Sequence, residues 1–353
     1  MNTLILGAGE SGVGAALLAR HLGHDVFVSD KGKISEKYKA ELNDKAIPNE
    51  EGQHSMEKIL QADQVIKSPG IPDHIPLIKT LESKGIPVIS EIEFAGRHTK
   101  ACIIGITGSN GKTTTANLAF HLLNSAGFNV ALGGNVGYSF ARLVLQAQHD
   151  FFVLELSSFQ LDGITDFRPH VAILLNITPD HLDRYDYRME NYIASKLRII
   201  RNQKPEDLFI YNGQDENIHK YLYEKTIVPQ TAVITTEMIE EDAIRLGDTR
   251  FEMRESSLKG QHNYFNALCA VKAALHLGAE PKSIQAGLKS FVNAPHRLES
   301  VASVDGVEYI NDSKATNVDA VYYALQAMTK PVIWIVGGED KGNDYQPLMP
   351  LVE

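Results

Sequence analysis

Residues 106–114 read ITGSNGKTT, and this glycine-rich stretch decides the fold. The usual phosphate-binding loop follows the pattern G-x-x-x-x-G-K-[ST] between a strand and a helix. Here Ile106 occupies the position of the first glycine, so the pattern is broken. Gly108 and Gly111 still permit the positive φ angles that a tight loop requires. We therefore interpret the stretch as a nucleotide site of a different form and not as an accidental turn.

The residues on both sides of this loop favour phosphate binding. Residues 113–127 predict a helix whose first N–H groups and dipole would point at the loop. Lys112 can reach the β- and γ-phosphates of ATP, and the Thr113 hydroxyl can bind Mg²⁺. Glu155 ends an apolar run, where it would serve either as a metal ligand or as an ion-pair partner.

A second glycine turn lies at the start of the chain. Glycines at positions 7, 9 and 12 form G-x-G-x-x-G between a predicted strand and a predicted helix, and the next strand ends at Asp30. This unit is typical of dinucleotide-binding folds, so an NAD-dependent oxidoreductase is one hypothesis. The turn is only moderately specific, because it can serve any diphosphate at a helix N-terminus.

Apolar runs alternate with helical segments along most of the chain, which predicts an α/β protein with parallel sheets. The apolar runs in 150–160 and 169–185 end in polar residues, as expected for buried parallel strands with functional groups at their C-terminal tips. The pattern restarts after the first predicted domain and again after a turn-rich joint. We therefore predict three domains, at 1–95, 96–295 and 296–353.

Composition and charge limit the function classes. The chain has 353 residues, of which 43% are hydrophobic and 22% are charged, so it is long enough for two or three packed domains. A formal net charge of −10 disfavours nucleic-acid binding. The N-terminus does not look like a signal peptide, and no window reaches the ~20 apolar residues of a membrane span. We therefore expect a cytoplasmic protein.

Charged residues also lie at the end of the apolar run in 169–185. The stretch ITPDHLDRY places Asp180, His181 and Asp183 at a strand tip, either as a structural cluster or as part of a metal site. Lys196 lies on the next predicted helix, near its apolar face, where a lysine is costly unless it is paired or neutral. The alternative for Lys196 is a side chain that extends to water.

Together these motifs resemble the Mur ligase family, and within it the enzymes that add D-glutamate. The resemblance covers the whole chain and rests on TGSNGKTT, GGNVG, ELSSFQLD, NITPDHLDRY, KLRI, GQHNYFNA, APHRLE, NDSKATN and GGEDKG. The phosphate loop of the family has the form TG-x-NGK-[ST], so Ile106 is expected. The resemblance implies a Rossmann-like N-terminal domain, a central P-loop ATPase domain with a parallel sheet, and a partial Rossmann-like C-terminal domain.

The resemblance also implies a reaction in peptidoglycan precursor synthesis. ATP, with Mg²⁺, would convert the carboxylate of UDP-N-acetylmuramoyl-L-alanine to an acyl phosphate, which the amine of D-glutamate would then attack. The N-terminal domain would bind UDP and not NAD. No nucleic-acid partner and no membrane span are expected, and the enzyme is expected to be a cytoplasmic monomer.

Positions that match the family motifs imply roles for individual residues. The catalytic residues would be Lys112, Glu155, His181, Lys196, Arg297 and Lys314. The ATP-binding residues would be Gly108, Ser109, Asn110, Gly111, Lys112, Thr113, Thr114, Asn263, Arg297 and Asp312. The UDP-substrate would be bound by Ser11, Gly12, Asp30, Lys31, Gly70, Asn135, Ser157 and Gln160. D-Glutamate would be bound by Thr316 and Lys341, and Mg²⁺ by Thr113, Glu155, His181 and a carbamylated Lys196.

The sequence departs from the family near its end. About 55 residues follow Arg297, which is few for an independent core. We expect a truncated C-terminal domain in which a last strand, 331–338, lacks partners. Two alternatives to ligase activity stay open at this point: an NAD-dependent oxidoreductase, and a fragment that binds nucleotides without catalysis.

Overall fold

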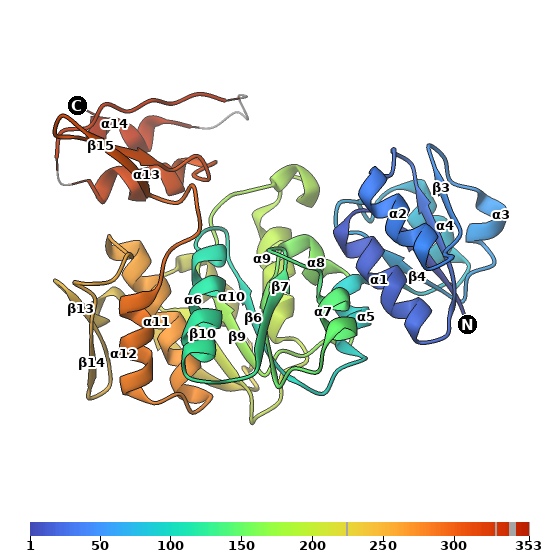
Figure 1. Cartoon of the computed structure of the whole chain (residues 1–353), viewed down its shortest axis with the longest axis horizontal. Helices are drawn as coiled ribbons and strands as arrows, with labels where there is room; N and C mark the ends of the chain where they lie inside the picture. The colour runs from blue at the N-terminus through green and yellow to red at the C-terminus, as the bar shows by residue number, and fades with distance from the viewer. Residues whose placement is uncertain (224, 329, 339–343, 353) are drawn as a thin grey trace.

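A computed structural model of the chain describes residues 1–223, 225–328, 330–338 and 344–352. Figure 1 shows three groups of elements along the chain. The first group (blue) is built on one parallel sheet, the second (green to orange) on a larger parallel sheet, and the third (red) on a hairpin and short helices. We refer to the first two groups as the N-terminal unit and the middle unit.

The N-terminal unit has a five-stranded parallel sheet in the order β3-β2-β1-β4-β5. Its central strand β1 is almost entirely buried, because helices cover both faces of the sheet, and so it is a continuous apolar run. The strands are β1 (Asn2–Leu6), β2 (Asp25–Asp30), β3 (Asn49–Glu51), β4 (Gln64–Lys67) and β5 (Val88–Ser90). The helices are α1 (Glu10–His21), α2 (Glu36–Asp44), α3 (Met56–Ile59), α4 (Pro76–Ser83) and α5 (Glu91–Gly96).

The middle unit has a six-stranded parallel sheet in the order β11-β10-β9-β6-β8-β7. Its strands are β6 (Cys102–Thr107), β7 (Val130–Gly134), β8 (Phe151–Glu155), β9 (Val171–Leu174), β10 (Leu208–Asn212) and β11 (Gln230–Ile234). After β6 the chain runs to the far edge at β7, returns to β8, and then crosses to β9 on the other side of β6. The carboxyl end of β6 therefore lies at a topological switch point, where parallel sheets bind their ligands.

Helices and a small antiparallel sheet complete the middle unit. The helices are α6 (Lys112–Ser125), α7 (Phe140–Gln146), α8 (Ser158–Asp162), α9 (Met189–Leu197), α10 (Glu216–Leu222), α11 (Gln261–His276) and α12 (Pro281–Ser290). Short 3-10 turns are η1 (Leu182–Tyr185), η2 (Arg198–Ile200) and η3 (Thr236–Met238). The small sheet contains β12 (Ile239–Glu240), β13 (Ala243–Leu246) and β14 (Thr249–Glu252).

One hydrophobic cluster is shared by the two units. It includes Ile5 and Val13 from the N-terminal unit, Phe94 from α5, and Phe140 and Phe152 from the middle unit. The ring centroids of Phe140 and Phe152 lie 5.0 Å apart in an edge-on arrangement. The two units therefore pack through a common apolar core, which fixes how their ligand-binding edges face each other.

The C-terminal part differs from the prediction. Strands β15 (Glu299–Val304) and β16 (Val307–Asn311) form an antiparallel hairpin, followed by α13 (Val318–Gln326), η4 (Gln346–Leu348) and α14 (Met349–Val352). The predicted helix is present as α13, but residues 331–338 form no strand. A strand requires a neighbour for its backbone groups, and no strand among the described residues pairs with this segment. The expectation of a strand at 331–338 was wrong for this reason.

The described part of the chain contains no helix that is both long enough and apolar enough to cross a membrane.

Candidate active site

The phosphate loop joins β6 to α6. Ile106 is fully buried within β6 and lies between Glu155 of β8 and Ile173 of β9 in the parallel register. The strand thus extends past the position where the usual pattern has its first glycine, which explains why that glycine is absent. Gly111 caps α6 with φ of 84°, and a Cβ atom there would lie 2.5 Å from Oδ1 of Asn266. Both the backbone conformation and the space require glycine at this position.

Neighbouring asparagines hold the loop in shape. The Asn110 N–H donates to Oδ1 of Asn176 at 2.8 Å, and the Asn317 side-chain amide donates to Oδ1 of Asn110 at 2.9 Å. The Ser109 hydroxyl donates to the Thr178 carbonyl at 2.8 Å. The first N–H groups of α6, by contrast, have no partner within the helix, as at every helix N-terminus. They are the donors left to bind an anion.

Lys112 lies over its own loop. Its Nζ donates to the carbonyls of Gly108 and Ser109 at 2.8 and 2.9 Å. Burial lowers the pKa of Lys112, and the negative charges of Glu155 and Asp180 oppose that shift. Backbone carbonyls and nearby acids thus stabilise the charge on Nζ of Lys112. An incoming phosphate could replace these carbonyls as the hydrogen-bond acceptor.

Lys196 is almost fully buried on α9, with 2% of its surface exposed. Its Nζ donates to the Gly108 carbonyl at 2.8 Å and lies 4.6 Å from the centre of the Tyr192 ring. Burial lowers the pKa of Lys196 well below its ordinary value, and the charge of Lys112 adds to this shift. The alternative of a side chain that extends to water is therefore excluded.

Glu155 ends β8 beside the loop. Its Oε1 accepts a hydrogen bond from Nδ2 of Asn135 at 2.8 Å, whereas Oε2 is buried and has no hydrogen-bond partner in the described structure. A buried carboxylate oxygen without a partner is costly, and a cation beside it would remove the cost. The described residues contain no group of three His, Cys, Asp or Glu side chains that could hold a metal. A metal here would need ligands of other kinds, such as the Thr113 hydroxyl.

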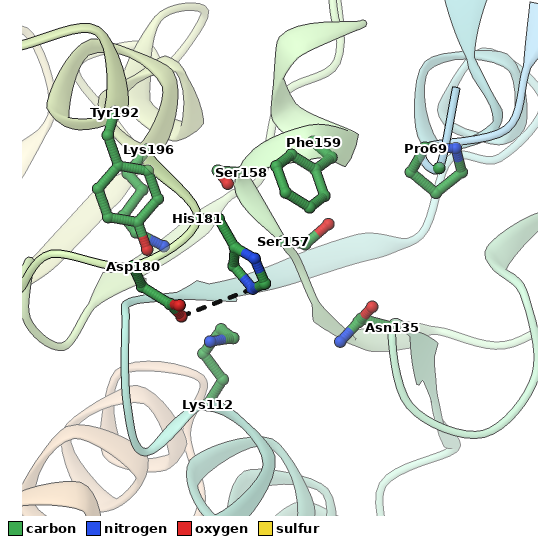
Figure 2. Close-up of a pocket in the computed structure, with 11 residues that line it drawn as sticks. Pro69, Lys112, Asn135, Ser157, Ser158, Phe159, Asp180, His181, Tyr192 and Lys196 are labelled. Atoms are coloured by element: carbon green, nitrogen blue, oxygen red, sulfur yellow. Dashed lines mark ion pairs between the residues drawn. The ribbon is translucent and has the colours of Figure 1, made fainter. Parts of the chain in front are cut away.

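His181 and Asp180 lie across from Lys112 (Figure 2). His181 Nε2 is 3.6 Å from Oδ2 of Asp180, and the imidazole packs edge-on against Phe159, with ring centroids 5.3 Å apart. His181 has φ of 51°, an uncommon left-handed conformation for a residue other than glycine. This conformation lets the strand tip turn sharply into η1 and leaves the imidazole more than half exposed.

These side chains surround a cavity of about 300 Å³ between the two units. Figure 2 shows Pro69 of the N-terminal unit facing Asn135 and Lys112 of the middle unit across it. The residues that line the cavity are Pro69, Gly70, Lys112, Asn135, Ser157, Ser158, Phe159, Asp180, His181, Tyr192 and Lys196. Arg184 on η1 donates to the carbonyls of Pro69 and Gly70, both at 3.3 Å, and so connects the two walls.

Comparison with known proteins identifies the fold and the family. Residues 1–90 match the Mur ligase MurD-like N-terminal domain, and residues 106–274 match the Mur ligase middle domain. The chain is 51% identical over 360 residues to the UDP-N-acetylmuramoylalanine–D-glutamate ligase of Christiangramia forsetii, covering 99% of this chain and 81% of that protein. The enzyme of the same name from Bacteroides fragilis is 48% identical over 361 residues, with the same coverage.

The chain belongs to the Mur ligase family. The predicted family is thus confirmed, and so are the α/β fold with parallel sheets and the class of ATP-dependent, amide-forming ligases. The oxidoreductase hypothesis rested on the first glycine turn alone, and that turn lies within the matched MurD-like domain.

Solved structures of more distant Mur ligases share the fold. The UDP-N-acetylmuramate:L-alanyl-γ-D-glutamyl-meso-diaminopimelate ligase (MPL) of Neisseria meningitides superposes with a TM-score of 0.61 at 23% identity, over 83% of this chain and 98% of that one. The UDP-N-acetylmuramate–alanine ligase MurC of Thermotoga maritima gives a TM-score of 0.58 at 22% identity, over 93% of this chain and 77% of that one.

In this Mur ligase the N-terminal glycine turn is held by Asp30. Its Oδ2 accepts from the Ala8 N–H at 2.6 Å and its Oδ1 from the Gly32 N–H at 2.7 Å. Asp30 therefore supports the turn through both oxygens. Among the other predicted residues of this unit, Gly12 is buried at the start of α1, Ser11 is partly buried, and Lys31 and Gly70 are exposed.

Of the site residues predicted in the C-terminal part, the structure brings some to the phosphate loop and leaves others away from the cavity. Nη2 of Arg297 donates to the Thr113 hydroxyl at 2.8 Å, so this residue does reach the phosphate loop. Oδ1 of Asp312 accepts from the Leu298 N–H at 3.0 Å, and burial raises the pKa of Asp312. Lys314 and Thr316 are exposed and are not among the cavity-lining residues, and Lys341 lies outside the described residues.

Three more predicted residues do not line the cavity. Gln160 forms a capping box with Ser157 at the start of α8, and its side chain does not line the cavity. The Asn263 amide donates to the Lys259 carbonyl at 2.9 Å at the start of α11. Thr114 is buried in the first turn of α6.

Other site residues were not predicted from the sequence. Asn176, Asn266 and Asn317 shape the phosphate loop, and Tyr192 lies against Lys196 while its hydroxyl is 3.1 Å from the Ser109 hydroxyl. Asn266 follows Asn263 by three residues on one helix, and this spacing places both on one face. That spacing could have indicated Asn266, and Asn176 opens the quoted motif NITPDHLDRY, but no comparable signal marked Tyr192.

Proposed function

We propose that this protein joins D-glutamate to UDP-N-acetylmuramoyl-L-alanine at the expense of ATP, through an acyl phosphate. The observation that supports this most is the shared cavity, which has the Gly70 loop of the N-terminal unit on one wall and Lys112 of the phosphate loop on the other. A substrate with a diphosphate at one end and a carboxylate at the other fits such a position. The names of relatives about 50% identical over 99% of this chain point to the same reaction.

The arrangement meets the electrostatic demand of this reaction. A carboxylate must attack the terminal phosphate of ATP, so two anions have to approach each other. Lys112 and the N-terminus of α6 lie beside the position where they would meet. Arg297 already contacts Thr113 and would neutralise further charge at the phosphates. The role of these groups is to orient the reactants and to lower their repulsion.

We further propose a magnesium site beside the phosphate loop. The buried, unpartnered Oε2 of Glu155 supports a cation there, and Thr113, His181 and Lys196 would complete its ligands. When bound, magnesium would supply positive charge that offsets the negative charge of the phosphates. The depressed pKa of Lys196 favours a neutral amine, which can take up CO₂ and become an anionic carbamate ligand.

The remaining roles are extensions of the same proposal. Ser11, Gly12, Asp30, Lys31 and Gly70 would bind the UDP, and Asn135, Ser157 and Gln160 the muramoyl-alanine end. Gly108, Ser109, Asn110, Gly111, Thr114, Asn263 and Asp312 would contact ATP, Lys314 would approach the reacting phosphate, and Thr316 and Lys341 would bind D-glutamate. We propose domain boundaries at 1–95, 96–295 and 296–353 and a cytoplasmic monomer.

A phosphate-release assay tests the function directly. We expect release of phosphate only when ATP, Mg²⁺, UDP-N-acetylmuramoyl-L-alanine and D-glutamate are all present. Full turnover with L-glutamate and none with the D-isomer would contradict the proposed specificity. Nucleotide binding with no turnover under any of these conditions would instead favour a non-catalytic nucleotide-binding protein.

A further inference from the structure

A buried ion-pair group joins the N-terminal unit to the middle unit. Glu10, the first residue of α1, points its carboxylate at α7, where Oε1 accepts from Nε of Arg142 at 2.8 Å and from the Ser139 N–H at 3.1 Å. Oε2 accepts from Nη2 of Arg142 at 3.2 Å. Nη1 of Arg142 donates to Oε2 of Glu41 on α2 at 2.8 Å. We call Glu10, Glu41, Ser139 and Arg142 the latch.

The latch is buried at its centre, while the Glu10 and Glu41 side chains are 24% and 27% exposed. Arg142 has only 9% of its surface exposed, and Ser139 has none. A Cβ atom on Gly14 of α1 would lie 2.0 Å from the Ser139 hydroxyl oxygen, so the two helices approach as closely as a glycine allows. Removing one member leaves the others without their partners, so loss of Glu10 or of Arg142 weakens this contact between α1 and α7.

The latch connects two parts of the proposed substrate site. On one side, Glu10 directly precedes Ser11 and Gly12 in the glycine turn. On the other side, Ser139 ends the short loop after β7 that carries Asn135. Asn135 is fixed in turn by Glu155, through its side-chain amide to Oε1 and through its N–H to the Glu155 carbonyl, both at 2.8 Å. A short chain of bonds thus runs from the diphosphate turn to the proposed metal ligand.

We propose that Glu10 and Arg142 are positioning residues that align the UDP end of the substrate with its reacting carboxylate end. This inference rests on the proposed function. UDP alone would contact the N-terminal unit, whereas the whole substrate must also reach the cavity wall of the middle unit. The latch should therefore matter for the whole substrate and hardly at all for UDP.

The test compares the affinities for UDP and for UDP-N-acetylmuramoyl-L-alanine by calorimetry. In Glu10→Ala and in Arg142→Met, we expect UDP affinity to stay within about twofold, while the whole substrate binds at least about fivefold more weakly, the lower end of typical coupling between sites. KM for the sugar nucleotide should rise in parallel, and KM for ATP should not change.

Arg168→Met is the matched control. Arg168 also pairs with two acids, with Nε 2.6 Å from Oδ2 of Asp207 and Nη2 2.8 Å from Oε1 of Glu206, but all three lie in the middle unit and none lines the cavity. We expect Arg168→Met to leave both affinities unchanged, even if it lowers the melting temperature.

Two results would overturn the inference: equal losses of affinity for UDP and for the whole substrate, or no loss for either. Circular dichroism and thermal melting establish that each variant is folded. If Glu10→Ala fails to fold, Glu10→Gln, which keeps an acceptor for the Ser139 N–H, takes its place and should give a smaller loss confined to the whole substrate. Failure of the unmutated protein to bind the whole substrate or to turn over with D-glutamate would overturn the proposed function itself, and is recognised without any variant.

Discussion

At the scale of single residues, the site depends on two lysines that face the same carbonyl. Nζ of Lys112 and Nζ of Lys196 both donate to the Gly108 carbonyl at 2.8 Å, so the two amines lie close together. Burial lowers the pKa of both lysines. The charge of Lys112 lowers the pKa of Lys196 further, whereas the charges of Glu155 and Asp180 oppose the shift at Lys112. The two lysines differ in exposure, because Lys196 is almost fully buried and Lys112 is only partly so. We therefore expect Lys112 to contact the phosphates and Lys196 to act as the carbamylated metal ligand.

Replacement of Lys112 tests the role of the phosphate loop. In Lys112→Ala we expect kcat to fall by roughly 10²–10³-fold, the usual loss when one preorganised electrostatic contact is removed. Steady-state assays of phosphate release measure it. Lys282→Ala, at an exposed lysine on α12, is the control and should keep its full rate. An unchanged rate in Lys112→Ala would contradict catalysis at this loop.

Replacement of Lys196 tests the carbamate. In Lys196→Ala we expect a similar loss of activity, because a ligand for the metal would be missing. Added acetate or formate should restore part of the rate, since a small carboxylate can occupy the place of the carbamate. The unmutated protein should lose activity when CO₂ is removed from the buffer. No response to carboxylates or to CO₂ would leave Lys196 as a structural lysine bonded to Gly108.

At the scale of elements, helix α5 connects the two units through two buried acids. Oε2 of Glu93 accepts from the N–H groups of Thr165, Asp166 and Phe167 at 2.9, 3.0 and 2.8 Å. Oε1 of Glu91 accepts from the Ala141 N–H at 2.5 Å, while Oε2 of Glu91 has no partner in the described structure. Burial raises the pKa of Glu91 to about 8, with a further contribution from the charge of Glu10.

This shift predicts how stability depends on pH. Between the ordinary glutamate pKa of 4.5 and about 8, the folded protein holds a proton on Glu91 that the unfolded chain has released. The free energy of unfolding should therefore fall as pH rises through this range, by roughly 1.4 kcal/mol per pH unit from this group. Glu91→Gln should remove that slope, so that the variant gains stability relative to the unmutated protein up to about pH 8.

Thermal or denaturant unfolding of both proteins at pH 5, 6.5, 8 and 9 measures the effect. The difference in free energy between Glu91→Gln and the unmutated protein should grow to about pH 8 and then level off. Glu82→Gln, at an exposed glutamate on α4, should show no such trend. Parallel pH curves for Glu91→Gln and the unmutated protein would mean that Glu91 is ionised in the fold.

Some of the helices, strands and loops could be predicted from the sequence, and others could not. The parallel strands and the phosphate loop were predictable, because buried apolar runs and the glycine, lysine and threonine of the loop are local signals. The hairpin β15–β16 and the absence of a strand at 331–338 were not, since pairing depends on which neighbour is available. Asn176 and Asn317 were missed for a similar reason, because each acts only after the fold brings it to Asn110.

At the scale of the whole molecule, the cavity proposed to bind the substrate lies between units that share one core. The cluster that contains Ile5 and Val13 continues through Phe94 to Phe152, and the latch and Glu93 join the same surfaces by polar contacts. A rigid joint of this kind suits a long substrate whose two ends are bound by different units. It also means that the N-terminal unit should not unfold separately.

This gives a last prediction, on cooperative unfolding. We expect scanning calorimetry to show a single transition for the N-terminal and middle units. UDP should shift this transition upward although, under the proposed function, it would contact only the N-terminal unit. At a concentration 100 times its Kd, UDP should add about 2.7 kcal/mol to the free energy of unfolding. In Asp30→Ala the shift should disappear, because Asp30 supports the turn through the N–H groups of Ala8 and Gly32. Two separate transitions, of which UDP moves only the first, would show instead that the shared core does not couple the units, and that alignment of the substrate depends on the polar contacts alone.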